Sequence, residues 1–174
     1  MQLFNCDEEN LKNFAYEIYR KLKPSARPVF LCVGSDKFVC DSMAPIVAEM
    51  LTKKYNINAY VYGGLDYNIN GRNLNVAINY IESQHPESQI ILVDATVGDN
   101  VGKVEVCAGT FAGMGKLIPI KKIGNFSILA VVGKKEKTFD LNTVRLANVY
   151  NLSKFIAKGI AMAISVTRYD KICL

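Results

Sequence analysis

Histidine is almost absent from this chain of 174 residues, which contains only His85. The catalytic triads of hydrolases and multi-histidine metal sites both need well-placed histidines, so their near absence argues against both classes. His85 is followed by a proline in a polar turn, where a surface residue is expected. We therefore expect neither a bound metal nor another cofactor.

Paired cysteines and long apolar runs are also missing. The five cysteines are odd in number and form no C-x-x-C motif, and the polar, acidic start does not resemble a signal peptide. Both features favour a reducing cytoplasm. The most apolar stretch near the carboxyl end is interrupted by Lys154 and Lys158, so no membrane span is expected. The net charge of +5 is spread along the chain without a nucleic-acid-binding motif, and a nucleic-acid partner is not expected.

The common nucleophile and nucleotide motifs are missing as well. There is no G-x-S-x-G and no G-x-G-x-x-G after the first predicted strand. The glycine-rich segment 109–116 fits a P-loop poorly, because Leu117 replaces the magnesium-binding Ser or Thr and Pro119 disfavours a helix there. We expect this segment to be a loop over the strand edge that is suited to clamping a substrate.

Two apolar runs, residues 29–33 and 90–93, are the most informative feature that the sequence does contain. Neither run alternates polar with apolar residues, so both are typical of strands buried on both faces, as in a parallel sheet. Asp41 follows the first run after a short loop, and Asp94 ends the second. Ligands of open α/β sheets bind outside the carboxyl ends of the strands. Two carboxylates that meet at this edge can share a proton and activate a water molecule.

Each of these acids also has a structural explanation. Asp41 is expected to open a helix, where aspartate is a favoured cap, and Asp94 could form the turn after its strand. Cys40 lies beside the same helix start, but no histidine is placed to activate it, so a packed thiol is favoured over a nucleophile. A further option is hydrolysis with a metal held by Asp36, Asp41 and Asp94.

The rest of the chain predicts alternating helices and strands. Asp7 is expected to cap the first helix, which Pro24 ends, and further helices are expected near 41–51, 72–84 and 141–166. Strands are expected near 28–33, 58–62, 89–94, 104–107 and 126–132. This order predicts an α/β fold: a three-layer α/β/α sandwich with a mostly parallel mixed sheet.

Several blocks resemble one family. The segment 32–45, with Gly34-Ser35-Asp36 and Asp41-Ser42, resembles the G-[ST]-D-x-x-x-G-D-S-L-G-P signature of the YyaC-type sporulation proteins. Residues 91–95 resemble their V-D-A segment, residues 112–128 their glycine-rich loop and next strand, and residues 142–147 the start of their last helix. The similarity covers about residues 28–164. Cys40 and Ala44 stand where the signature has glycine.

This resemblance implies a relationship to the spore germination protease and, more distantly, to the hydrogenase maturation proteases. It implies a phosphorylase/hydrolase-like fold in one germination-protease-like domain, 1–174. In the germination protease, the aspartates that match Asp41 and Asp94 are associated with aspartic-type peptidase activity. In the hydrogenase maturation proteases, the matching acids help to bind nickel together with a later histidine, and this chain has no histidine after residue 85.

The leading hypothesis is a sporulation-associated peptidase-like protein in the cytoplasm of a sporulating cell, acting on a peptide or protein such as a spore protein. Asp41 and Asp94 would be the catalytic pair. Asp36, Gly113, Gly115 and Lys116 would bind the substrate, with Lys116 or backbone amides stabilising negative charge. The alternative is a non-catalytic sporulation factor that binds a peptide or protein in the same place, and the sequence leaves the choice between enzyme and binding protein open.

Overall fold

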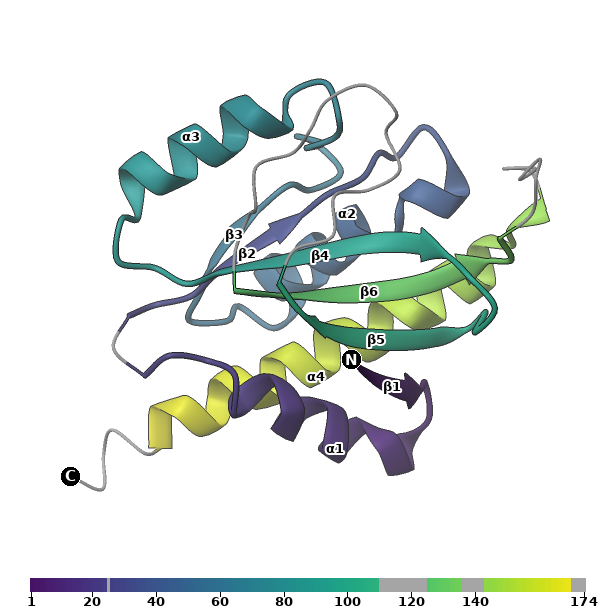
Figure 1. Ribbon diagram of the computed structural model, residues 1–174, viewed down its shortest axis with the longest axis horizontal. Helices are drawn as coiled ribbons and strands as arrows, with labels where there is room; N and C mark the ends of the chain where they lie inside the picture. The colour runs from purple at the N-terminus through teal and green to yellow at the C-terminus, as the bar shows by residue number, and fades with distance from the viewer. Residues whose placement is uncertain (25, 110–124, 136–142, 170–174) are drawn as a thin grey trace.

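A mixed six-stranded sheet forms the centre of the molecule (Figure 1). The computed structural model describes residues 1–24, 26–109, 125–135 and 143–169. The strands lie in the order β1-β5-β6-β4-β2-β3, and β5 alone among the described strands runs against the others. They are β1 (Gln2–Asn5), β2 (Val29–Cys32), β3 (Tyr60–Tyr62), β4 (Ile90–Val97), β5 (Lys103–Ala108) and β6 (Phe126–Gly133).

Helices cover both faces of this sheet (Figure 1). One core joins α1, α2 and α4 to one face, and a second core packs α3 against the other. The predicted three-layer α/β sandwich with a mostly parallel sheet is therefore confirmed. The helices are α1 (Glu8–Tyr19), α2 (Met43–Glu49), α3 (Leu74–Gln84) and α4 (Leu146–Tyr169), with a 3-10 turn η1 (Val39–Asp41) and a π-helical turn η2 (Met50–Lys54).

Burial explains why β2 and β4 carry unbroken apolar runs. All four residues of β2 are buried, and so are the first five of β4. Successive side chains of a strand point to opposite faces, so a strand between two helical layers needs apolar residues at every position. On β4, Ile91 and Val93 enter the core with α2 and α4, whereas Ile90 and Leu92 pack with α3.

The connections define a topological switch point between β2 and β4. From β2 the chain passes through α2 to β3, the neighbour of β2 on one side. It then returns through α3 to β4, the neighbour on the other side, across the opposite face of the sheet. Loops leave the carboxyl ends of β2 and β4 in diverging directions there, and ligands of open α/β sheets bind at such points.

The amino-terminal segment differs from the expectation of a helix alone. The predicted helix is present, and the Asp7 side chain caps it by accepting a hydrogen bond of 2.8 Å from the Asn10 amide. Before it, however, β1 pairs antiparallel with β5. Only Phe4 of this four-residue strand is buried, so no local pattern marks it, and the pairing partner decides its conformation. Among the described helices, none combines the length and apolar character that a membrane span requires.

Candidate active site

Asp94 lies inside a strand and not at its end. The sequence predicts a strand that stops at Asp94, but β4 continues to Val97, because Asp94 and the next residues pair with β6. On the other side, β2 ends at Cys32, opposite Val93. Asp94 is therefore the first residue of β4 to extend past the end of β2, on the side of the switch point. By strand alternation its side chain is on the face that bears α3.

The environment of Asp94 favours the protonated carboxyl. The residue is only 7% exposed, and Oδ1 accepts a hydrogen bond of 2.7 Å from the amide of Ala95. Burial raises the pKa of Asp94 to about 8, the Ala95 amide lowers it, and the nearby charge of Asp41 raises it further. Burial dominates because an ionised carboxylate loses its hydration inside the protein. At neutral pH, Asp94 therefore carries a proton and can donate a hydrogen bond.

Asp41 approaches the same place from the loop that follows β2. It is the last residue of η1, and its carbonyl accepts a hydrogen bond of 3.0 Å from the Ser35 amide. A Cβ on Gly34 would lie 2.2 Å from that carbonyl oxygen, so only glycine allows the loop to pack this closely. The expectation that Asp41 opens a helix is wrong: α2 begins at Met43, after Ser42, whose side chain makes no capping hydrogen bond and instead donates to the carbonyl of Val39 at 2.8 Å.

The two carboxyls form an asymmetric pair. Asp41 is half-buried, and burial raises its pKa, while the interaction with Ser35 lowers it. Asp94 is the more deeply buried, and the charge of Asp41 contributes to its raised pKa. Asp41 therefore ionises first, and its negative charge helps to retain the proton on Asp94. The fold thus brings together two carboxyls that differ in their tendency to ionise, which is the kind of arrangement that general acid–base chemistry uses.

The other predicted site residues divide into two groups. Asp36 is exposed in the loop between β2 and η1, and its amide donates a hydrogen bond of 3.1 Å to Oδ1 of Asn68. Gly113, Gly115 and Lys116 lie outside the described residues. Within the described part of the chain, no three acidic, cysteine or histidine side chains come close enough to hold a metal ion. Among the described residues, Asp36, Asp41 and Asp94 therefore do not form a metal site.

The surroundings of Cys40 and His85 indicate structural roles. Cys40 is buried, and both burial and the charge of Asp41 raise its pKa, which disfavours the nucleophilic thiolate. His85 stacks on Tyr60 with ring centroids 3.8 Å apart, and its Nε2 lies 2.7 Å from the hydroxyl of Tyr62. It precedes the amino end of β4, whereas the carboxyl pair is past the end of β2.

Asn68 is the site residue that sequence reasoning missed. Its side chain joins the loop after β3 to the loop that carries Asp36. Asparagine side chains often hydrogen-bond nearby backbone groups in turns, and the glycine pair Gly63-Gly64 shortly before Asn68 is typical of a turn. A surface depression of about 340 Å³ lies elsewhere, between β1 and α1, and none of its lining residues belongs to the carboxyl pair or its loops.

Comparison with known proteins agrees with the resemblance found in the sequence. A family model described as "Protein of unknown function (DUF1256)" matches residues 2–159. The "Uncharacterized protein YyaC" of Bacillus subtilis (strain 168) is 29% identical over 148 residues, which cover 80% of this chain and 71% of that protein. The relationships to the germination protease and to the hydrogenase maturation proteases stay predictions. Since the family model spans most of the sequence, this chain belongs to the DUF1256 family.

Proposed function

We propose that this protein hydrolyses peptide bonds with Asp41 as the general base and Asp94 as the general acid. The observation that carries the proposal is the asymmetric carboxyl pair at the switch point between β2 and β4. Two carboxyls with different pKa values can divide the roles of base and acid between them. The relationship to the germination protease that the sequence resemblance implies supports this choice of reaction, because the matching aspartates of that enzyme are associated with aspartic-type peptidase activity.

The proposed reaction begins when the Asp41 carboxylate accepts a proton from a water molecule, whose oxygen attacks the carbonyl carbon of the peptide. Asp94 donates its proton to the carbonyl oxygen, which leaves a neutral gem-diol. In the second step, Asp41 gives its proton to the amide nitrogen and the C–N bond breaks. One hydroxyl of the diol returns a proton to Asp94. The products are a carboxylic acid and an amine, and both aspartates regain their starting states.

This division of roles predicts how the rate depends on pH. Asp94 must be protonated, so kcat/KM falls as the pH rises through about 8. Asp41 must be ionised, so kcat/KM also falls below the raised pKa of that carboxyl. The profile is therefore expected to be bell-shaped, with its acidic limb above the usual range of aspartate.

The test uses a mixture of peptides made by digesting bacterial cytosolic proteins. The wild-type protein should generate new peptide termini that mass spectrometry detects, and Asp94→Asn and Asp41→Asn should each lower the rate by about 100-fold or more. Asp99→Asn, which alters an exposed carboxylate in the turn after β4, is the matched control and should keep full activity. Cleavage that survives both active-site substitutions refutes the mechanism. Peptides that the wild-type protein retains uncut would support the non-catalytic alternative.

A further inference from the structure

Two neighbouring loops display apolar side chains at the carboxyl ends of β2 and β3, on the same side of the sheet as the carboxyl pair. Phe38 and Val39 lie in the segment after β2 and are 51% and 37% exposed. Leu65 and Tyr67 lie in the loop after β3 and are 40% and 85% exposed. Both segments leave the carboxyl ends of adjacent parallel strands, so they lie at the edge of the sheet where a ligand is expected.

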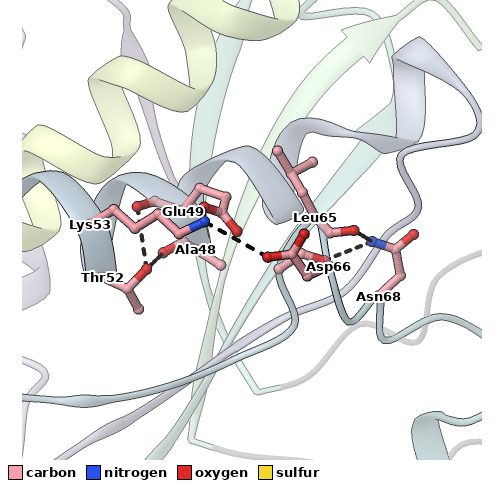
Figure 2. A network of polar contacts seen from close by, with 8 residues as sticks. Ala48, Glu49, Thr52, Lys53, Leu65, Asp66 and Asn68 are labelled. Carbon is pink, nitrogen blue, oxygen red and sulfur yellow. Dashed lines mark hydrogen bonds and ion pairs between the residues drawn. The ribbon is translucent and has the colours of Figure 1, made fainter.

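The loop of residues 64–68 has a well-defined shape. The amide of Gly64 donates a hydrogen bond of 3.1 Å to the carbonyl of Tyr67. The side-chain amide of Asn68 donates to the carbonyls of Gly64, at 2.7 Å, and of Leu65, at 3.2 Å (Figure 2). Nζ of Lys53 lies 3.8 Å from Oδ2 of Asp66, and this ion pair is drawn in Figure 2, but both side chains are exposed, so it adds little to the stability of the loop. The loop is shaped mainly by its own backbone and by Asn68.

The same loop is fixed relative to the candidate active site. At its start, Gly63 has a φ of +84°, and a Cβ there would lie 2.0 Å from the carbonyl oxygen of Cys32, so glycine is required. Beyond it, Oδ1 of Asn68 accepts from the Asp36 amide at 3.1 Å, and the amide of Gly34 donates to the Ile69 carbonyl at 2.7 Å. The segment that these bonds hold is the one that leads from β2 to η1 and Asp41.

An extended peptide is the partner that the proposed reaction requires at the carboxyl ends of these strands. Within the described sheet, β3 is the outermost strand next to β2, and its other edge has no paired strand. That free edge is separated from the carboxyl pair by β3 and β2, so it can pair only with a part of the peptide away from the cleaved bond, while side-chain subsites select the residues of that peptide. Apolar side chains on a preshaped loop bind with a small loss of conformational entropy, and tyrosine is well suited to such contacts.

We propose that Leu65 and Tyr67, together with Phe38 and Val39, form a subsite that binds an apolar side chain of the peptide cleaved between Asp41 and Asp94. The inference rests on the proposed function and adds a substrate class to it: extended peptides with an aromatic or aliphatic residue at a fixed distance from the cleaved bond. Leu65 and Tyr67 determine specificity and take no part in the chemistry.

The experiment compares the sequences around the cleaved bonds for wild type, Leu65→Ala and Tyr67→Ala, with the same peptide mixture. The loop should keep its shape, since its hydrogen bonds come from the backbone and Asn68. The wild type should favour an apolar residue at one position, and both variants should lose this preference. For the best peptide of the profile, KM should rise about tenfold with kcat little changed, as expected for lost apolar contacts. Tyr16→Ala on α1, 65% exposed in the wild type, is the matched control.

A binding measurement separates this inference from the proposed function. The best peptide, labelled with fluorescein, is titrated with Asp94→Asn and with the double variant Asp94→Asn/Tyr67→Ala, and fluorescence anisotropy reports the Kd. A Kd about tenfold weaker in the double variant supports the subsite without any turnover. If the wild type cuts no peptide, the proposed function fails, and the profile of retained peptides tests the subsite instead. An unchanged profile and unchanged affinity in the Tyr67→Ala variants overturn the inference, even where cleavage depends on Asp94.

Discussion

Replacing Asp94 with asparagine should change how the stability of the protein depends on pH. The folded state holds a proton on Asp94 up to about pH 8, whereas the unfolded chain releases it near pH 4. Between these values the folded state binds more protons, so the free energy of unfolding falls as the pH rises. The contribution of the proton is complete below about pH 4, decreases through neutral pH, and is lost above about pH 8.

The magnitude follows from proton linkage. Where the folded state binds one proton more than the unfolded state, the free energy of unfolding falls by about 1.4 kcal/mol per pH unit. Between pH 5 and pH 7 this amounts to about 3 kcal/mol. Asparagine cannot ionise, but its Oδ1 can still accept the 2.7 Å hydrogen bond from the Ala95 amide. Between pH 5 and pH 7 the wild type should lose about 3 kcal/mol that Asp94→Asn does not lose. The difference in the free energy of unfolding between the variant and the wild type should therefore shift by about 3 kcal/mol in favour of the variant.

The assay is urea denaturation at a series of pH values from 5 to 7.5. Because the chain contains no tryptophan, far-UV circular dichroism is the appropriate signal. Asp99→Asn serves as the surface control and should stay parallel to the wild type. A difference between Asp94→Asn and the wild type that does not vary with pH would show that Asp94 titrates as an ordinary carboxyl. That result would refute both the raised pKa and the role of Asp94 as an acid.

Two substitutions away from the site test the packing of the fold. A Cβ on Gly159 of α4 would lie 2.3 Å from the buried ring of Phe14, so Gly159→Ala should destabilise the protein by about 1–3 kcal/mol, despite the helix preference of alanine. Gly71→Ala, where a Cβ meets nothing within 4 Å, is its control, and equal thermal stability of the two variants would contradict the predicted clash. The buried Gln89 makes two hydrogen bonds of 2.8 Å to backbone groups of the segment after α1, so Gln89→Leu should cost about 1–3 kcal/mol in urea denaturation. Limited proteolysis should then cut this segment faster, and an unchanged cleavage rate would count against its role as a clamp.

The layers of the fold could be predicted from the amino-acid sequence alone. Apolar runs without alternation identify strands covered on both faces, and β2 and β4 are such strands. The cap at Asp7 was also predictable, because it depends on residues three positions apart. These features were predictable for a physical reason. The cap depends on residues close together in the chain, and a strand that is buried on both faces needs apolar residues at every position, which the sequence shows directly.

The properties of the candidate active site could not be predicted in this way, because they arise from contacts between segments that are distant in the chain. Asp94 lies inside β4 because residues from 94 onward pair with β6, which begins more than 30 positions later. Its raised pKa comes from burial and from Asp41, which is 53 positions away in the chain. The bond from Asp36 to Asn68 likewise joins loops that no local pattern connects. Strand pairing, burial and charge coupling depend on segments that are distant in the sequence. The sequence therefore identified two candidate acids, but only the folded structure gives them different pKa values.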